Sequence, residues 1–340
     1  MMHLLVTGGC GFIGSHFIRH ILSAHPGYSV VNLDALTYAG NPDNLKDIRE
    51  GDRYSFVKGR VEDAGLVKGL LREADAVVHF AAESHVDRSI ADARPFLTTN
   101  IIGTYTLLEA ARNASIRRFV HISTDEVYGA LGDAGKFTEE TPLRPNSPYS
   151  ASKASADLLV RACQETFGFP AIIVRPSNNY GPYQFPEKLI PLMITNLLED
   201  RPVPVYGKGQ NVRDWLFAED NCRAIDLILH NGKGGEIYNV GGNSERKNIE
   251  VVRKVLEIMG KDESLITYVQ DRPGHDYRYA LDTSKIEREL GWKPSVDIDA
   301  GLRRTIRWFR ENEWWWRPLR ERLQSEGAGF RTEKKKRRSS

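Results

Sequence analysis

The sequence is poor in cysteine and has no long run of apolar residues. Its three cysteines, Cys10, Cys163 and Cys222, are odd in number and widely spaced among 340 residues. They match neither a disulfide framework nor the short spacings of a metal site, which favours a reducing compartment. No apolar run approaches the roughly 20 residues of a membrane-spanning helix, and MMHLLVTGG carries no charged leader or cleavage site, so we expect no signal peptide. We accordingly expect a cytoplasmic protein without a membrane partner.

A strong net charge is also missing, except in a short C-terminal stretch. The chain carries a formal net charge of +2, with 41% hydrophobic and 27% charged residues, as in ordinary globular proteins. The last ten residues, RTEKKKRRSS, contain six positive charges and one negative charge, or +5, so the other 330 residues sum to −3. Such an end is typical of a solvated segment. We therefore predict a disordered basic tail at 326–340 and no nucleic-acid partner.

Short apolar runs alternate with amphipathic stretches through the first half of the chain. HLLVTGG precedes IGSHFIRHILSAH, and SVVNLD, AVVHFAA, RRFVHIST and AIIVRPSN continue the series between helical patterns. Strand and helix in alternation predict an α/β fold of the Rossmann type, a doubly wound parallel sheet with helices on both faces. Five prolines between residues 177 and 205 then change this rhythm.

This change in the pattern of strands and helices predicts that the chain forms two domains. We expect residues 1–175 to form a dinucleotide-binding domain, joined by returning segments near 214–240. Residues 176–325 are expected to form mainly a smaller C-terminal lobe that binds the substrate. The lobe would close over the carboxyl edge of the sheet, where open α/β sheets bind their ligands.

The first predicted strand-to-helix turn carries closely spaced glycines. VTGGCGFIG places Gly8, Gly11 and Gly14 between a strand and a helix. Glycines permit a tight turn and a close approach of the backbone to a pyrophosphate, which the helix N-terminus stabilises. Asp34 ends the next strand, twenty residues after Gly14, where a carboxylate can accept hydrogen bonds from ribose hydroxyls. The pattern predicts a dinucleotide site, and the acid favours NAD over NADP.

A tyrosine and a lysine four residues apart open a predicted helix. Tyr149 and Lys153 would lie about one helical turn apart, so the ammonium can lie beside the phenol. A nearby cation is expected to lower the tyrosine pKa toward a range useful for proton transfer from a substrate hydroxyl. Tyr54 and Lys58 have the same spacing, but only Tyr149 follows Thr124 by 25 residues at the head of a helix. We therefore assign a role to the second pair alone.

These features together resemble a known family. The glycine turn, Asp34, Thr124 and the Tyr149–Lys153 pair resemble the extended short-chain dehydrogenase/reductases. Further stretches are similar to the dTDP-glucose 4,6-dehydratases, namely LTYAGN (36–41), AAESHVDRSI (81–90), STDEVYG (123–129), SNNYGPYQFPEKLIPL (177–192), NVRDWL (211–216) and DRPGHD (271–276). The similarity spans residues 3–320, and these stretches are far more specific than a glycine turn.

The resemblance implies a hydro-lyase that acts on dTDP-glucose. In that family NAD takes a hydride from C4, water is lost across C5 and C6, and the hydride returns to C6 to give dTDP-4-keto-6-deoxyglucose. By resemblance Tyr149, with Lys153, takes the C4 hydroxyl proton and Thr124 holds the C4 oxygen. Asp125 is implied as the acid for the C6 hydroxyl and Glu126 as the base for the C5 proton. This division requires one neutral and one charged carboxyl, which two close carboxyls in a dry cleft favour.

The resemblance also implies two binding surfaces. The residues implied for NAD are Gly8, Gly11, Phe12, Ile13, Gly14, Asp34, Thr37, Arg60, Val61, Ala81, Thr99, Tyr149, Lys153 and Asn179. Those implied for the nucleotide sugar are Ser84, Thr124, Asn178, Lys188, Leu189, Pro204, Tyr206, Arg213, Asn248, Arg272 and His275. Arg213 and Arg272 match diphosphate ligands, and Tyr206 would stack on the base. No residue distinguishes a thymidine from a uridine nucleotide.

The chain departs from the family pattern at two positions. Arg60 precedes Val61 in VKGRVED, where the family usually has an aspartate near the adenine. The hydrogen bond of that acid to the adenine amino group is lost, so NAD is held more weakly or the backbone makes the bond. Tyr277, in HDYRYALD, stands where arginine is common.

Metal binding and assembly are predicted from less specific signals. His79, His85 and His121 have no partner at a convincing ligand spacing, so we predict no metal site. Helices near 96–112 and 149–168 carry apolar residues on more than one face. The family uses these two helices in a four-helix dimer interface, so we expect a homodimer.

Two alternative functions fit the same fold. An NAD-dependent UDP-sugar epimerase or UDP-glucuronate decarboxylase would share the glycine turn and the Tyr149–Lys153 pair. An epimerase needs no acid pair after its threonine, however, and a decarboxylase needs a site for the sugar carboxylate. A non-catalytic NAD-binding regulator would be expected to have lost the tyrosine–lysine pair. The stretches STDE and NNYGPYQFPEKLIP favour the dehydratase.

Overall fold

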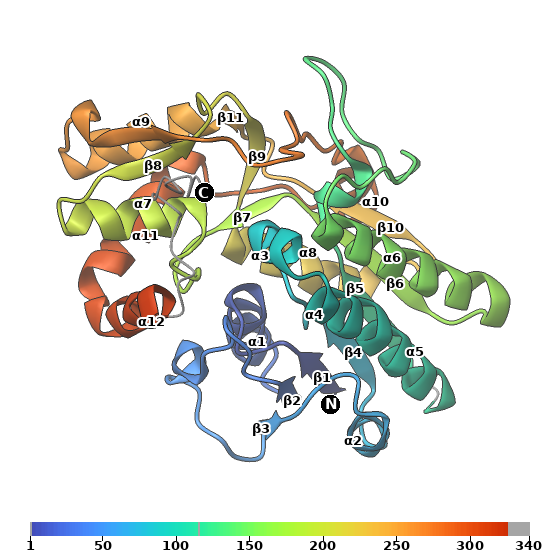
Figure 1. The fold of residues 1–340 in the computed structure, drawn as a ribbon. Helices are drawn as coiled ribbons and strands as arrows, with labels where there is room; N and C mark the ends of the chain where they lie inside the picture. Colours follow the sequence, from blue (N-terminus) through green and yellow to red (C-terminus); the bar gives the residue numbers. More distant parts are fainter. Residues whose placement is uncertain (1, 115, 326–340) are drawn as a thin grey trace, which may run out of the picture.

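A parallel sheet of seven strands forms the centre of the chain (Figure 1). The structure is a computed structural model and describes residues 2–114 and 116–325, so the predicted tail at 326–340 lies outside it. The strand order is β10-β6-β5-β4-β1-β2-β3, and every neighbouring pair is parallel. The bounds are β1 Met2–Thr7, β2 Tyr28–Asp34, β3 Tyr54–Lys58, β4 Ala76–His79, β5 Arg118–Ile122, β6 Ala171–Pro176 and β10 Ile237–Val240. The predicted Rossmann-type α/β fold is confirmed.

Helices cover both faces of this sheet because its strands are apolar on both faces. Leu4 and Val6 of β1 pack on one face and Leu5 packs on the other, as the two-residue period of a strand requires. The first face is covered by α1 (Phe12–Ala24) and α8 (Ala218–Asn231). The second is covered by α2 (Ala64–Leu70), α5 (Thr104–Asn113) and α6 (Pro148–Phe167), of which α5 and α6 run side by side in Figure 1.

The connection between β4 and α5 is irregular and helps to build the site. It contains α3 (Val86–Ala91), α4 (Arg94–Phe96) and a π-helical stretch, η2 (Leu97–Gly103). Within η2, the Asn100 amide donates to the Glu83 carbonyl at 3.0 Å and to Ser152 Oγ at 2.8 Å. Its Oδ1 accepts from the Glu83 N–H at 2.8 Å. Asn100 therefore ties the loop after β4 to α6.

A second lobe lies beyond the carboxyl ends of the central strands. Its three-stranded sheet consists of β7 (Asn178–Tyr180), β9 (Val212–Phe217) and β11 (Glu245–Lys247), and β8 (Val203–Tyr206) pairs with β12 (Ile266–Val269). Its helices are α7 (Leu189–Leu198), α9 (Asn248–Met259), η4 (Glu263–Leu265), α11 (Ile298–Glu311) and α12 (Glu313–Ser325). Phe309, Trp315 and Trp316 are completely or almost completely buried in the core between them.

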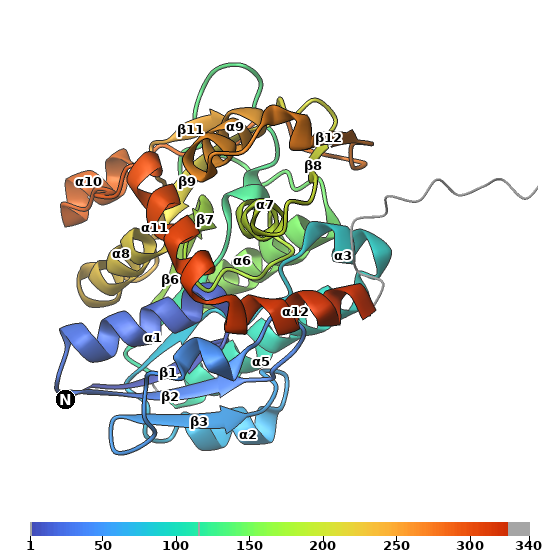
Figure 2. The ribbon, with the colours of Figure 1, turned by 90° about the vertical axis from the view of Figure 1, so that its left-hand side faces the viewer.

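The chain passes between the two parts several times. After β9 it returns to the central sheet as α8 and β10, and α10 (Ser284–Leu290) packs there again. Figure 2 shows α11 running down to α12 at the edge of the lobe. Trp315 of α12 donates its indole N–H to Asn44 Oδ1 at 2.8 Å, in the short helix η1 (Pro42–Leu45) after β2. Within the described chain, no helix has both the length and the apolar character needed to cross a membrane.

Candidate active site

Glycine shapes the turn that leads from β1 into α1. Gly8 has a φ of 73°, and a Cβ added there would lie 2.6 Å from the Ala81 backbone nitrogen. A Cβ added at Gly14 would lie 2.3 Å from the Gly8 carbonyl oxygen. No side chain fits at such distances, so the first turn of α1 packs directly against the preceding loop. The turn and the helix N-terminus face a cavity at the carboxyl edge of the sheet.

Asp34 holds this turn in place from the end of β2. Its Oδ2 accepts a hydrogen bond from the Cys10 N–H at 2.9 Å, and its Oδ1 accepts from the Leu36 N–H at 2.8 Å. Burial raises the pKa of the Asp34 carboxyl, whereas these two hydrogen bonds lower it. Each carboxylate oxygen keeps a further lone pair, so the group can still accept hydrogen bonds from a ligand in the cavity.

The cavity beside the glycine turn collects almost all the residues predicted to bind NAD. Those that line it are Gly8, Gly11, Phe12, Ile13, Gly14, Asp34, Thr37, Arg60, Val61, Ala81, Thr99, Tyr149 and Lys153. Asn179 does not line it. The Asn179 amide donates to the Ser177 carbonyl at 2.9 Å and its Oδ1 accepts from Asn221 at 2.9 Å, so both ends of the side chain are engaged elsewhere.

A second cavity adjoins the first between the sheet and the lobe. Of the residues predicted to bind the nucleotide sugar, those that line it are Ser84, Asn178, Lys188, Leu189, Pro204, Tyr206, Arg213, Asn248, Arg272 and His275. Ser84, Glu187 and Lys188 line both cavities, so a ligand in one can reach a ligand in the other. Thr124 lines neither and is buried behind them, next to the phenol of Tyr149.

The acid pair lies in a tight 3-10 turn, η3 (Asp125–Tyr128), directly after β5. Thr124 caps this turn, since its hydroxyl accepts from the Glu126 N–H at 3.3 Å and donates to Asp125 Oδ1 at 3.3 Å. Gly129 ends the turn with a φ of 86°, where a Cβ would lie 2.3 Å from the Arg144 carbonyl oxygen. Asp125 is 2% exposed and its Oδ2 has no hydrogen-bond partner among the described residues. Glu126 lines the second cavity.

The two carboxyls lie in different electrostatic surroundings. Burial, followed by repulsion from Glu126, raises the pKa of Asp125 well above its ordinary value. Burial also raises the pKa of Glu126, but Arg213, Lys188 and Arg272 lower it. Two close acids in a dry site tend to share one proton, and these causes leave that proton on Asp125.

Tyr149 and Lys153 lie in the first turns of α6, which Ser147 caps by accepting from the Ser150 N–H at 3.1 Å. The prediction of a lowered Tyr149 pKa is wrong for this arrangement. Burial, followed by the Glu126 carboxylate, raises the Tyr149 pKa. The Lys153 ammonium donates to the Ile122 carbonyl at 2.7 Å. Burial lowers the Lys153 pKa to about 8, which leaves the ammonium present at neutral pH.

A buried polar network lies under Lys153. Asp157, one turn further along α6, raises the Lys153 pKa against the effect of burial. Arg175 Nε donates to Asp157 Oδ2 at 2.9 Å, and His121 Nε2 lies 3.5 Å from Oδ1 of the same carboxylate. Burial lowers the pKa of both His79 and His121, so these histidines are neutral parts of the interior. Sequence reasoning missed Asp157, although its spacing of four residues from Lys153 on one helix was a signal.

The far end of the second cavity carries aromatic and cationic groups. Arg272 Nε lies 3.4 Å from Asp87 Oδ1, and its guanidinium lies 5.0 Å from the centre of the Tyr206 ring. The Tyr206 hydroxyl donates to Asp87 Oδ2 at 3.1 Å. Arg213 is nearly buried and donates to the Asp276 carbonyl at 2.9 Å. This arrangement offers two guanidinium groups and one aromatic face to a ligand.

Sequence reasoning missed several residues that line this cavity. Glu187 stands directly before Lys188, and its carboxylate lies 3.2 Å from Arg88 Nε. Asp87 and Tyr279 also line the cavity. Each of these residues lies inside or beside a family-specific stretch, so its position in the stretch was the signal that could have found it.

The two departures from the family pattern are both at the surface. The Arg60 side chain is 60% exposed and pairs with Glu62, with Nη1 3.2 Å from Oε1. Arg60 still lines the first cavity. Tyr277 is exposed and donates its hydroxyl to Asp133 Oδ1 at 3.0 Å, away from both cavities. Only the Arg60 departure therefore bears on ligand binding.

Comparison with known sequences identifies the relatives of this chain. The sequence model of the GDP-mannose 4,6 dehydratases matches residues 5–305. A dTDP-glucose 4,6-dehydratase of Xanthomonas campestris is 53% identical over 331 residues, which cover 92% of this chain and 94% of the relative. A dTDP-glucose 4,6-dehydratase of Escherichia coli is 52% identical over 342 residues, with the same two coverages.

Solved structures distinguish the dehydratases from epimerases of the same fold. DesIV, a dTDP-glucose 4,6-dehydratase from Streptomyces venezuelae with NAD and TYD bound, matches with a TM-score of 0.92 and 55% identity, over 94% of this chain and all of DesIV. A UDP-glucuronic acid 4-epimerase from Bacillus cereus matches with a TM-score of 0.86 but only 29% identity, over 91% of this chain and 99% of the epimerase. Both proteins share the fold of this chain, whereas its sequence is much more similar to that of the dehydratase. The chain therefore belongs to the dTDP-glucose 4,6-dehydratase family.

Proposed function

We propose that this chain is a hydro-lyase that converts dTDP-glucose into dTDP-4-keto-6-deoxyglucose with NAD as its cofactor. The observation that carries this function is the Asp125–Glu126 pair, both members of which act on the pKa of Tyr149. Tyr149 lines the first cavity and Glu126 the second, whereas Asp125 is buried behind them. An epimerase changes only C4 and needs no further acid or base. A dehydratase must also remove the C5 proton and protonate the departing C6 hydroxyl, and the two carboxyls supply these functions.

The residues around the first cavity fit NAD. The glycine turn leaves no room for a Cβ at Gly8 or Gly14, so a pyrophosphate can approach the backbone and the N-terminus of α1. Asp34 has lone pairs left for ribose hydroxyls. When bound, NAD supplies a hydride acceptor that takes the C4 hydrogen and later returns it to C6. The glycine turn and Asp34 are the groups that would hold it.

We assign proton removal at C4 to Tyr149. A phenol is protonated at neutral pH, and burial and Glu126 raise its pKa further, so Tyr149 needs a nearby positive charge to act as a base. Lys153, one turn further on α6, is the group that provides this charge. Thr124 lies next to the phenol and favours its ionised form. We assign its hydroxyl to the C4 oxygen because the phenol takes its proton from the same group.

We assign elimination across C5 and C6 to the acid pair. Glu126 faces the second cavity and three cations oppose the effect of burial on its pKa, so it is the carboxylate that takes the C5 proton. Asp125 is buried and keeps its proton, so it is the acid that gives a proton to the departing C6 hydroxyl. The C5–H and C6–O bonds break, the C5=C6 bond forms, and water leaves.

We assign the second cavity to the nucleotide sugar. Arg213 and Arg272 suit the diphosphate because a guanidinium binds phosphate oxygens through two parallel hydrogen bonds. The ring of Tyr206 offers a stacking face to the base. The other residues that we assign to this surface are Ser84, Asn178, Lys188, Leu189, Pro204, Asn248 and His275.

The decisive experiment is mass spectrometry of dTDP-glucose carrying deuterium at C4, after incubation with the purified protein. We expect loss of one water with the deuterium found at C6 of the product. Isomerisation of UDP-glucose without a change of mass would instead establish an epimerase, and loss of carbon dioxide from UDP-glucuronate a decarboxylase. NAD binding without turnover of any of the three would establish a regulator.

We also propose that the chain forms a homodimer. In the described chain, six exposed large apolar side chains lie along α3, η2, α5 and α6, namely Ile90, Leu97, Ile102, Tyr105, Leu158 and Phe167. α6 contacts α3, η2 and α5, so these side chains come from neighbouring elements. Exposed apolar surface of this extent marks interaction sites, and a second copy of the same helices would cover it.

The location that we propose is the cytoplasm. Cys10, Cys163 and Cys222 are all buried and unpaired. Free thiols persist in a reducing compartment, and NAD is available there. Detection of the protein in the cytosolic fraction of its host would test this location.

A further inference from the structure

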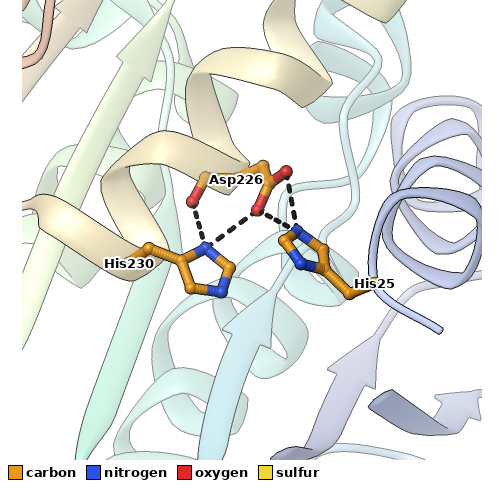
Figure 3. A group of neighbouring side chains, drawn as sticks. All are labelled: His25, Asp226 and His230. Atoms are coloured by element: carbon orange, nitrogen blue, oxygen red, sulfur yellow. Dashed lines mark hydrogen bonds and ion pairs between the residues drawn. The ribbon is translucent and has the colours of Figure 1, made fainter. Parts of the chain in front are cut away.

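Histidines from two neighbouring helices gather around one carboxylate, apart from both cavities. His20 lies in α1, and His25 caps the C-terminus of that helix, whereas Asp226 and His230 lie in α8. His25 Nε2 lies 3.0 and 3.1 Å from the two carboxylate oxygens of Asp226, and His230 Nδ1 lies 2.9 Å from Oδ1. Figure 3 shows both rings turned toward this carboxylate.

We propose that His25, Asp226 and His230 form a binding site for a divalent transition-metal ion, and that zinc is the ion that fits best. One ligand atom from each residue lies within 4.8 Å of the other two. Zinc binds imidazole nitrogen and carboxylate oxygen at about 2.0–2.2 Å, so its ligand atoms must come to about 3–4 Å from one another. Small side-chain rotations would bring the three ligand atoms from within 4.8 Å to this shorter separation. Three protein ligands leave a fourth position for water.

The groups around the three ligands are those that a metal site requires. Metal-binding histidines donate the N–H of their second nitrogen to a nearby acceptor. In the structure His230 Nδ1 lies 2.8 Å from the Asp226 backbone carbonyl, which can only accept, so binding of the ion must replace this bond. The Tyr28 hydroxyl lies 2.8 Å from His230 Nε2 and can then accept the N–H of that nitrogen. His20 Nε2 lies 2.8 Å from Asp226 Oδ2 and would hold the oxygen that does not bind. Two of the three ligands therefore have partners that orient them.

The cluster is open to solvent. The side chains of His25, Asp226 and His230 are 15–29% exposed, so an ion can enter from solvent. The alternative is a purely protein network, in which the imidazoles donate to Asp226 with no ion between them.

The two alternatives differ in what the imidazole nitrogens present. In a purely protein network each nitrogen carries an N–H that donates to Asp226, whereas in a metal site it turns a lone pair toward the ion. The rings of His25 and His230 stack with centres 4.8 Å apart. A bound ion would join α1, which begins at the glycine turn, to α8 on the same face of the sheet. We therefore assign the ion a structural effect on stability.

This proposal departs from the sequence-based expectation of no metal. That expectation considered His79, His85 and His121 and their local spacings. On α8 only Asp226 and His230 are close in sequence, and His25 comes from about two hundred residues earlier in the chain. Only the packing of α1 against α8 brings the three together.

The test is metal binding by the full-length chain, purified without a histidine tag and stripped with EDTA. Zinc affinity is measured near neutral pH by competition with a chromogenic indicator, and Co²⁺ is added separately to record its visible absorption. We expect one equivalent of zinc to bind, the absorption of a four-coordinate Co²⁺, and a rise in Tm with zinc. We expect His25→Gln and His230→Gln each to weaken binding by about 100-fold or more, and Tyr28→Phe by about 10-fold.

His3→Gln is the matched control, because His3 is an exposed histidine that bonds Ser29 outside the cluster. It should leave zinc affinity unchanged. Absence of a bound equivalent in the unaltered chain would overturn the proposal, as would binding that is equally tight in His25→Gln and His230→Gln. Circular dichroism of each variant without metal separates loss of the site from loss of the fold. Dehydratase activity should survive metal removal, so the site and the proposed reaction fail or succeed separately.

Discussion

Asp125 and Glu126 are adjacent in the chain, but their carboxyls have different neighbours. Three cations, Arg213, Lys188 and Arg272, lower the pKa of Glu126 against the effect of burial. For Asp125 the second largest effect after burial is repulsion from Glu126 itself. Burial raises the pKa of both carboxyls, and that of Asp125 is raised well above its ordinary value. The elimination that we propose uses this difference, with Asp125 as the acid and Glu126 as the base.

The first prediction separates these two roles with a change of leaving group. We expect Asp125→Asn and Glu126→Gln each to lower kcat on dTDP-glucose by about 10²- to 10⁴-fold, the usual contribution of general acid–base catalysis. Fluoride leaves without a proton, so dTDP-6-deoxy-6-fluoroglucose should restore much of the rate of Asp125→Asn. It should not restore Glu126→Gln, because the C5 proton must still be removed. Fluoride release measures both rates.

The matched control is deuterium uptake at C5 from D₂O, followed by NMR. Asp125→Asn should retain this exchange on the product that it forms, whereas Glu126→Gln should lose it. If the fluorinated substrate rescued Glu126→Gln instead, the two roles would be exchanged.

The second prediction concerns pH. Burial lowers the Lys153 pKa from an ordinary value near 10.5 to about 8, so the ammonium is present below about pH 8 and lost above it. We expect kcat/KM to fall as pH rises through 8. The unfolded chain binds more protons than the folded chain between the two pKa values, so this group makes stability rise over the same range. Activity and stability should therefore change in opposite directions.

The third prediction places Asp157 as a positioning residue for Lys153. Its carboxylate raises the Lys153 pKa, so Asp157→Asn should move the alkaline limb of kcat/KM to lower pH. Asp157→Glu, which keeps the charge, should return the limb toward its original position. A merely structural role would lower Tm and leave the limb in place, because Arg175 would lose its buried partner without any effect on Lys153.

The fourth prediction tests the departure at Arg60. Arg60→Asp restores the acid that the family usually places near the adenine, and one added hydrogen bond is worth about 0.5–1.5 kcal/mol. We expect NAD to bind about 2- to 10-fold more tightly, measured by calorimetry on protein freed of nucleotide. Arg60→Ala is the control that removes the arginine without adding an acid. Equal affinities in Arg60→Asp and Arg60→Ala would mean that the backbone already makes the bond.

The fifth prediction concerns assembly. Leu158 is 56% exposed on α6 within the proposed dimer surface, and burying a charge there without a partner is unfavourable. We expect Leu158→Glu to reduce the mass by light scattering from twice 38.4 kDa to 38.4 kDa. Trp314→Glu, at an exposed aromatic residue on α12, should leave the mass unchanged. A single-chain mass for the unaltered protein would refute the dimer.

The sequence by itself determined the central fold and the family. Alternating strands and helices predict a parallel sheet because strands that are apolar on both faces need a helix on each side. The role of Gly8 and Gly14 in the first turn could be predicted because a turn packed this closely against neighbouring backbone has no room for a side chain. The stretch STDEVYG, together with the other stretches shared with the family, was specific enough to indicate the acid pair. Each of these patterns lies within a short stretch of residues, so it can be recognised without the structure.

Tertiary structure decided the electrostatics and the long-range contacts. The spacing of Tyr149 and Lys153 indicated a lowered phenol pKa, but burial and Glu126 reverse it, and spacing carries no information on either. Asn179 lies in a family stretch, yet its side chain is bound by Ser177 and Asn221. His25 meets Asp226 only because α1 packs on α8. Burial and contact depend on the whole packed chain, so the fold alone fixes them.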